Sequence, residues 1–335
     1  MGHEVHFFEK DVPYYSSRRD FERCDYCRLT LYQEWQQVRK QALQTARESD
    51  VVMTASYLPE GKRISDEILD LGRPLRVFYD LDTPVTLRNM AGQGVEYLRP
   101  DQLSAFDLVL SFTGGSVLEE LERDFGVRMA RPLYGCVDPD IYGRVEASRE
   151  FACDLSYMGT YAADRQEKLD ELFLEPARRH PEKEFLLAGS LYPWQWQWPQ
   201  NVRRTDHVFP DAHPYFYSSS RMTLNLTRQE MARNGWCPSG RFFEAAACGT
   251  PLITDWWQGL DSFFDVAKDL EVVATAEQVE SALHRDDRDL RAMAAHARAR
   301  TLDEHTGEVR AKQLLQFFEE ARSARPAKIV AQEVA

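Results

Sequence analysis

The stretch "PSGRFFEAAACGTPLIT" (residues 238–254) carries the signals of a short helix followed by a buried strand. Ser239 is placed to cap the helix and Gly249 to end it, and Pro251 prevents the helix from continuing. A helix that leads directly into an apolar strand is the repeating unit of α/β proteins. The stretch therefore predicts one helix–strand unit of an α/β domain.

Arg241 and Glu244 are three residues apart, so they share the polar face of this helix near its N-terminus. An arginine beside a helix N-terminus is a ready site for a phosphate. A glutamate one turn further in can accept hydrogen bonds from two sugar hydroxyls. The pattern predicts a nucleotide site, with phosphate at Ser239 and Arg241 and ribose at Glu244. A simple surface ion pair between Arg241 and Glu244 explains the spacing equally well.

Outward from this stretch, apolar strands alternate with helices along the whole chain, without an internal repeat. The strands are expected at 4–9, 50–55, 75–80, 106–112, 127–134, 153–160, 184–190, 206–210, 222–227, 251–255 and 271–275. Helices are expected at 29–48, at 115–126 with Ser116 as its cap, and along 276–322. A segment rich in Gly, Pro and Asp (133–144) separates the two halves and is expected to link two domains.

This alternation predicts an α/β protein of two doubly wound, Rossmann-like domains that face a cleft. We expect an N-terminal acceptor-side domain (1–140), a C-terminal nucleotide-sugar donor domain with a long helical region (141–322) and a flexible tail (323–335). The chain begins directly at "GHEVHFF" (2–8), so the first domain is expected to lack its N-terminal strand and loop.

Composition excludes several classes of function. The 335 residues carry a net charge of −13, which argues against a protein that coats a nucleic-acid polymer but not against binding one nucleotide. No stretch approaches the roughly 20 apolar residues of a membrane span, and six cysteines are too few for a disulfide scaffold, so a cytoplasmic protein is expected. Cys24 and Cys27 lack the second pair of a structural zinc site and are interpreted as incidental thiols.

Taken as a whole, the chain resembles the group 1 glycosyltransferases of the GT-B fold, and more narrowly the CgeB-type spore-maturation glycosyltransferases. The supporting segments are "FYDLDTP" (78–84), "FDLVLSFTGG" (106–115), "PLYGCVDPD" (132–140), "SYMGTYAADRQ" (156–166), "FLLAGSLYP" (185–193), "LNLTR" (224–228), 238–254 and "EHTGEVR" (304–310). The resemblance implies that Glu244 binds the ribose, that Arg165 meets the diphosphate together with Arg241, and that Gly159 lets the backbone approach the ligand. It also implies a nucleotide sugar as substrate, no cofactor, no metal and a retaining reaction.

Two positions depart from this family pattern. Many group 1 enzymes carry a glutamate eight residues before the ribose-binding one, and that position is Trp236 here. Thr160 stands where an arginine often follows the strand glycine. The diphosphate clamp is therefore expected to be assembled from Arg165 and Arg241.

Three further groups of residues allow more than one interpretation. Asp80 and Asp82 end a strand and could hold a metal, could form a hydrogen-bonded turn, or could place Asp82 in contact with the acceptor, where it is also the candidate base. Gly114 and Gly115 offer backbone N–H groups on the acceptor side, or only a tight turn. The tryptophans at alternate positions of one loop form a substrate platform, or pack on their own domain: Trp194, Trp196 and Trp198.

The expected function is transfer of a sugar from a nucleotide-sugar donor to an unidentified glycan, lipid or protein acceptor, with Asp82 and Glu244 as the candidate catalytic residues. A non-catalytic nucleotide-sugar-binding or scaffold protein remains an alternative, as does a nucleotide-sugar epimerase of the same fold. A nicotinamide-dependent oxidoreductase is disfavoured because no G-x-G-x-x-G follows a strand. No nucleic-acid polymer is expected as a partner.

Overall fold

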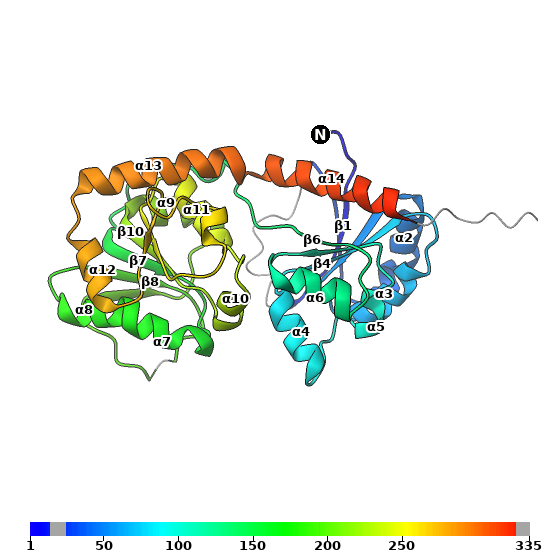
Figure 1. Ribbon diagram of the computed structural model, residues 1–335, viewed down its shortest axis with the longest axis horizontal. Helices are drawn as coiled ribbons and strands as arrows, with labels where there is room; N and C mark the ends of the chain where they lie inside the picture. The colour runs from blue at the N-terminus through cyan, green and yellow to red at the C-terminus, as the bar shows by residue number, and fades with distance from the viewer. Residues whose placement is uncertain (14–24, 194, 326–335) are drawn as a thin grey trace, which may run out of the picture.

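The computed structural model describes residues 1–13, 25–193 and 195–325. The chain forms two lobes, each built around a parallel sheet with helices on its faces (Figure 1). The first domain is drawn in blue and cyan, and the second in green to orange. Cys24 and Trp194 lie outside the described residues, so the interpretations that involve them stay predictions.

The second domain has a six-stranded, wholly parallel sheet in the order β12-β11-β10-β7-β8-β9. Its strands are β7 (Cys153–Met158), β8 (Phe185–Ala188), β9 (Val202–Thr205), β10 (Ser220–Asn225), β11 (Leu252–Thr254) and β12 (Glu271–Val272). With β7 counted first, this is the 3-2-1-4-5-6 order of doubly wound sheets, whose ligands bind where the order reverses. That point lies between the carboxyl ends of β7 and β10.

Helices cover both faces of this sheet (Figure 1). They are α7 (Gln166–Leu169), α8 (Glu175–Arg179), α9 (His213–Ser219), α10 (Gln229–Asn234), α11 (Gly240–Ala247), α12 (Ala276–Leu283) and α13 (Asp287–Glu304). In α11, Phe242 and Phe243 are fully buried in the core, whereas Arg241 and Glu244 stay partly exposed. The amphipathic pattern of 238–254 therefore has the orientation that the sequence predicted.

The first domain has a four-stranded parallel sheet in the order β3-β4-β5-β6 and a separate parallel pair, β1-β2. Its strands are β1 (His6–Lys10), β2 (Arg28–Tyr32), β3 (Val51–Ala55), β4 (Leu75–Asp80), β5 (Leu108–Ser111) and β6 (Ala130–Pro132). Its helices include α2 (Trp35–Glu48), α3 (Gly61–Leu69), α4 (Thr83–Ala91), α5 (Pro100–Leu103) and α6 (Ser116–Asp124). The apolar strands β4 and β5 form the centre of this core.

The last helix, α14 (Gly307–Ala324), returns from the second domain to the first. Figure 1 shows α13 along the second domain and α14 continuing along the first. Its Leu314, Phe317 and Phe318 pack against the core of the first domain. The two crossing segments are bonded to each other, because Val137 N–H donates to His305 O (3.0 Å) and Gly307 N–H donates to Val137 O (3.0 Å). The chain thus crosses twice between the domains at one point, around Val137 and His305, which we call the hinge.

The structure corrects three expectations. The strand predicted at 206–210 is wrong: β9 precedes it, and its polar residues Arg203 and Arg204 at a sheet edge obscured the apolar pattern. Residues 28–32 form β2, so the helix predicted from 29 begins only at Trp35. Gly115, not Ser116, is the N-cap of α6. The helical region predicted at 276–322 is confirmed and consists of three successive helices.

The caps expected for α11 are confirmed. Ser239 is its N-cap, although its side chain makes no capping hydrogen bond, and Gly249 follows the helix with a φ of 68°. No helix in the described part of the chain is long and apolar enough to cross a membrane.

Candidate functional site

Gly159 follows β7 at the reversal point of the second sheet, and the backbone there is closely packed. A Cβ on the neighbouring Gly189 would lie 2.0 Å from Gly159 O, and a Cβ on Gly159 would lie 2.6 Å from the Tyr157 hydroxyl. The Tyr192 hydroxyl donates to Gly159 O at 3.0 Å. Gly189 is therefore required by its packing against the Gly159 backbone, and the side chains of Tyr157 and Tyr192 pack around Gly159.

Arg165 follows closely and is only 8% exposed. Its guanidinium donates to Thr160 O, while its Nε is buried without a hydrogen-bond partner among the described residues. No described carboxylate forms an ion pair with it. A buried cation without a counter-ion is costly unless an anion completes the site. The contact between Arg165 and a diphosphate, which the family resemblance implies, stays a prediction.

Arg241 lies in the first turn of α11 and faces the same region. Burial raises the pKa of Tyr192, and the positive charges of Arg165 and Arg241 partly oppose that rise, so both guanidinium groups lie near one phenol. In the part of the chain that the structure describes, Arg241 forms no hydrogen bond or ion pair. The alternative that it simply pairs with Glu244 on the surface is thus wrong.

Glu244 is instead held by helix α9. Tyr217 Oη donates to Glu244 Oε2 at 3.4 Å, and His213 Nδ1 lies 3.6 Å from the same oxygen. The other oxygen, Oε1, lies over the first turn of α11, 3.8 Å from where a Cβ on Gly240 would be. Oε2 is held by Tyr217, whereas Oε1 forms no hydrogen bond among the described residues and can accept one from a ligand hydroxyl.

Sequence reasoning missed His213 and Tyr217, although their spacing of four residues places them on one face of a helix. His213 is itself fixed, with Nε2 3.2 Å from Val208 O and Nδ1 3.2 Å from the Tyr142 hydroxyl.

Two further charged pairs at the carboxyl edge were also missed. Lys168 Nζ pairs with Asp255 Oδ2 after β11, and Asp255 Oδ1 accepts the Thr227 N–H (2.9 Å) after β10. Arg228 Nε pairs with Asp164 Oδ2 at 3.3 Å. These contacts tie the loops after β7, β10 and β11 together, and thereby fix the loop that carries Arg165.

On the first domain, Asp80 and Asp82 end β4. Asp80 is buried and accepts hydrogen bonds from Thr86 Oγ1 (3.0 Å) and the Asp82 N–H (3.1 Å), and burial raises its pKa to about 6. Asp82 is more exposed and accepts the Tyr57 hydroxyl at 2.7 Å. The hydrogen-bonded turn is the observed arrangement. No group of three or more His, Cys, Asp or Glu among the described residues is arranged to hold a metal ion.

Gly114 and Gly115 follow β5 and contact the second domain. A Cβ on Gly115 would lie 2.5 Å from Trp236 Cε3, and one on Gly114 would lie 2.1 Å from the Tyr134 hydroxyl. Trp236 thus packs against the turn that was predicted to lie on the acceptor side. That role of the two glycines stays a prediction.

The tryptophan-rich loop packs on its own domain. Trp196 lies 5.5 Å from the ring of Tyr161, Trp198 lies 5.7 Å from Tyr192, and Arg204 stacks on Trp198 at 4.5 Å. Trp196 and Trp198 therefore form an aromatic cluster that supports the region around Gly159.

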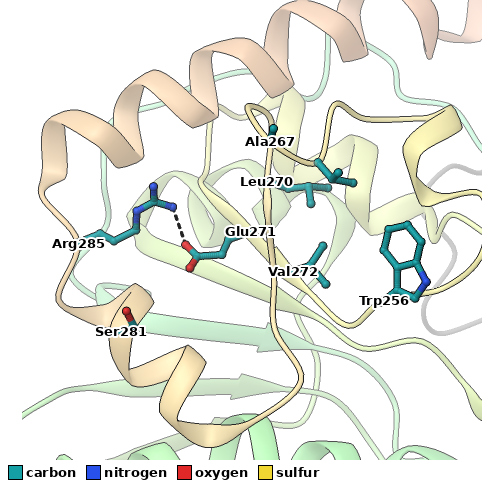
Figure 2. A pocket seen from close by; sticks show the side chains of 8 residues that line it. Trp256, Ala267, Leu270, Glu271, Val272, Ser281 and Arg285 are labelled. Atoms are coloured by element: carbon teal, nitrogen blue, oxygen red, sulfur yellow. Dashed lines mark hydrogen bonds and ion pairs between the residues drawn. The ribbon is translucent and has the colours of Figure 1, made fainter.

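A separate hollow of about 650 Å³ lies along the edge strand β12 (Figure 2). Figure 2 shows Glu271 paired with Arg285 (2.7 Å) at one end and Trp256, which is 53% exposed, at the other. The residues that line it are Trp256, Val266, Ala267, Leu270, Glu271, Val272, Ser281 and Arg285. None of the residues predicted for the donor site is among them.

Residues 165–316 match a protein-family model described as "Glycosyl transferase-like". This segment covers most of the second domain and includes Arg165, Arg241 and Glu244. No curated protein matches the sequence significantly.

Several solved structures share the fold. Sucrose-phosphate synthase from Thermosynechococcus elongatus has a TM-score of 0.66 at 14% identity, over 96% of this chain and 90% of that one. An alpha-glucosyltransferase in complex with UDP-glucose and DNA has a TM-score of 0.66 at 11% identity, over 94% and 99% of the two chains. HepE from Anabaena, in complex with UDP-glucose, has a TM-score of 0.59 at 12% identity, over 88% and 86%. The expectation of a two-domain, Rossmann-like GT-B fold is confirmed.

Proposed function

We propose that this protein is a glycosyltransferase that takes a sugar from a nucleotide-sugar donor held by its second domain. The observation that carries the proposal is a pair of arginines, Arg165 and Arg241. Both lie near Tyr192 at the reversal point of a doubly wound sheet, and neither has a carboxylate partner among the described residues. In a chain with a net charge of −13, two unpaired cations at this point favour an anionic ligand.

The ligand class follows from what lies around the arginines. The N-terminus of α11 adds backbone N–H groups at Ser239 and Gly240, which favour a phosphate. Glu244 lies one turn further in, with one oxygen fixed by Tyr217 and the other open. A diphosphate at the arginines and a ribose at Glu244 are separated by about one helical turn, as in a nucleoside diphosphate.

The family match over 165–316 and the UDP-glucose bound to two solved structures of this fold support the same assignment. In the reaction, the bond between the anomeric carbon and the diphosphate oxygen breaks, and the diphosphate leaves with the electron pair. Arg165 and Arg241 stabilise the negative charge that develops on it. The oxygen of an acceptor hydroxyl forms the new bond to the anomeric carbon, and its proton passes to a base, for which Asp82 is the candidate. Retention at the anomeric carbon, independence of a metal ion and a glycan, lipid or protein acceptor are part of the proposal.

Calorimetric titration with UDP, GDP, dTDP and ADP tests the donor site. We expect one nucleotide to bind saturably, and we expect Arg165→Ala, Arg241→Ala and Glu244→Ala each to weaken it by about 1–3 kcal/mol, the loss associated with a hydrogen-bonded charged partner. Arg178→Ala is the matched control, since this half-exposed arginine pairs with Glu175 on α8 of the same domain. Equal weakening in the control, or no effect of the three site variants, would contradict the proposal.

Product analysis then separates transfer from simple binding. Release of the free nucleoside diphosphate from the nucleotide sugar that binds, stimulated by an acceptor, supports an enzyme. Tight binding without release under any acceptor identifies the alternative, a non-catalytic nucleotide-sugar-binding protein. The anomeric coupling constant of the product by NMR tests retention, and activity in EDTA tests metal independence.

A further inference from the structure

Trp236 is the residue that stands where many group 1 glycosyltransferases carry a glutamate, and it occupies a contact between the two domains. Its indole lies between Gly115 of the first domain and Gly259 of the second. A Cβ on Gly115 would lie 2.5 Å from Trp236 Cε3, and a Cβ on Gly259 would lie 2.5 Å from Trp236 Nε1. Only glycine leaves room for the ring at either position.

Hydrogen bonds hold the backbone of the same segment across the domain boundary. Gly114 N–H donates to Trp236 O at 2.9 Å, and Asn234 Nδ2 donates to Gly114 O at 2.9 Å. On its own domain, Trp236 N–H donates to Gln258 O at 2.7 Å. We call the set Gly114, Gly115, Asn234, Trp236 and Gly259 the indole joint.

A further contact between the two domains involves α10, the helix that ends at Asn234. Arg88 of α4 pairs with Glu230 of α10 at 3.2 Å, and Figure 1 shows these two helices next to each other between the lobes. A further connection is the hinge where Val137 and His305 cross. The two domains are thus held at the hinge and at the indole joint, and the position of one domain relative to the other depends on both.

The joint is continuous with both sides of the proposed reaction site. Trp236 comes three residues before Ser239, the N-cap of the donor helix α11, and Gln258 and Gly259 follow Asp255, which pairs with Lys168. On the first domain, Phe112 N–H donates to Asp80 O at 2.8 Å, so the loop that carries Gly114 is attached to the end of β4.

From this geometry we propose that Trp236 is a positioning residue: through the indole joint, it sets the acceptor-side edge of the first domain against the donor helix. The proposal rests on the proposed glycosyl transfer. Its specific consequence is a separation of effects, because Arg165, Arg241 and Glu244 all belong to the second domain. Loss of the indole lowers turnover and leaves nucleotide affinity intact, whereas loss of a donor-site arginine lowers affinity.

The test uses two substitutions that open the joint from opposite sides, Trp236→Ala and Gly115→Ala, in the full chain. Each has a matched control. Trp256→Ala removes a half-exposed tryptophan whose side chain lines the hollow of Figure 2. Gly94→Ala introduces the same strain as Gly115→Ala, since both glycines have positive φ (82° and 76°), but its Cβ meets nothing within 4 Å.

Hydrogen–deuterium exchange is the primary measurement, because the Gly114 amide reports the joint directly and needs no substrate. In Trp236→Ala and Gly115→Ala, we expect the peptide that contains Gly114 to exchange at least about tenfold faster, and the two controls to match the wild type. UDP affinity by calorimetry is expected to stay within about twofold in all four variants, and UDP release from UDP-glucose to fall about tenfold or more in the first two. Trp236→Phe, which keeps a ring between the glycines, is expected to restore most of both signals.

Unchanged exchange at Gly114 in Trp236→Ala and Gly115→Ala would overturn the proposal. Equal loss of UDP affinity and turnover in Trp236→Ala would also overturn it, because the indole would then be a wall of the donor pocket. Failure of the proposed function looks different: no nucleotide binds to the wild type, while the exchange measurement still reports whether the joint holds the domains.

Discussion

The Tyr57 hydroxyl donates a 2.7 Å hydrogen bond to Asp82 Oδ2 at the carboxyl edge of the first sheet. Tyr57 has a φ of 64°, a left-handed conformation that costs a non-glycine residue about 1–2 kcal/mol, and its ring is 55% exposed against Tyr97 at 5.3 Å. The strained tyrosine therefore fixes the orientation of Asp82, one strand away from the turn that contacts Trp236.

Asp82→Asn tests whether this carboxylate acts on the acceptor. The amide keeps the size of the side chain and an oxygen for Tyr57, but it cannot take a proton. If Asp82 contacts or deprotonates the acceptor hydroxyl, we expect kcat to fall by about 10²-fold or more, the range for a proton-transfer group, with nucleotide affinity unchanged. Tyr57→Phe, which removes only the hydrogen bond, is expected to show a smaller loss. Full activity of Asp82→Asn would show that Asp82 serves only in the hydrogen-bonded turn with Asp80.

Local signals were sufficient to predict much of the fold. The caps and apolar face of α11 are encoded within residues 239–249, and β4 was predicted with its observed bounds because it is buried on both faces. β9 failed for the opposite reason: it is a polar edge strand whose Arg203 bonds to Ala152 O and Glu150 O on a neighbouring segment. Such contacts depend on tertiary structure and leave no periodicity in the sequence.

The residues of the candidate site likewise fall into those that the sequence predicts locally and those whose contacts depend on tertiary structure. Arg241 and Glu244 were found because they share one helix, and Arg165 was found through the family resemblance. Lys168 and Asp255 are 87 residues apart, and nothing in either segment indicates that they pair. Tyr217 and Glu244 are 27 residues apart on different helices, so their contact appears only when α9 packs on α11. Pairing across elements was the part that sequence alone could not supply.

Tyr217→Phe tests whether the fixed oxygen of Glu244 matters for nucleotide binding. The substitution removes the 3.4 Å hydrogen bond and keeps the ring, which is only 1% exposed. We expect nucleotide affinity to fall by about 0.5–1.5 kcal/mol, the usual net value of one hydrogen bond, and less than in Glu244→Ala. Tyr215→Phe, on the same helix but 46% exposed, is the control in the calorimetric titration. Equal effects of the two would show that Tyr217 does not act through Glu244.

Gly189→Ala tests the close packing beneath the proposed diphosphate site. The new Cβ would lie 2.0 Å from Gly159 O, so the two strand ends must separate, and overpacking of this kind costs about 1–3 kcal/mol. We expect a lower free energy of unfolding in urea and weaker nucleotide binding. Gly143→Ala is the control, because its Cβ would meet nothing within 4 Å. If the two variants unfold alike, the strand ends are more adaptable than the structure indicates.

The pH dependence of stability tests the buried polar contacts at the hinge. His305 is 4% exposed, its Nδ1 accepts from Arg310 at 2.7 Å, and its Nε2 lies 3.2 Å from Phe263 O. These contacts suit the neutral ring with its proton on Nε2. Burial, with the charges of Arg310 and Arg300, lowers the pKa of His305 from 6.5 to about 4. Between pH 6.5 and 4 the unfolded chain binds more protons at this residue than the folded one, so its contribution to stability is lost as the pH falls.

His305→Gln removes the titrating group and keeps a side chain that can donate and accept hydrogen bonds. On lowering the pH from 7 to 4, we expect the wild type to lose about 3 kcal/mol more unfolding free energy than this variant, by conversion of the pKa difference. Asp80, with a pKa raised by burial to about 6, changes stability in the opposite direction over this range, but it is present in both proteins and cancels in the comparison. Urea unfolding at each pH gives the two curves. Parallel curves would mean that His305 has the same pKa in the folded and unfolded chains, and that burial and the Arg310 hydrogen bond do not keep the ring neutral.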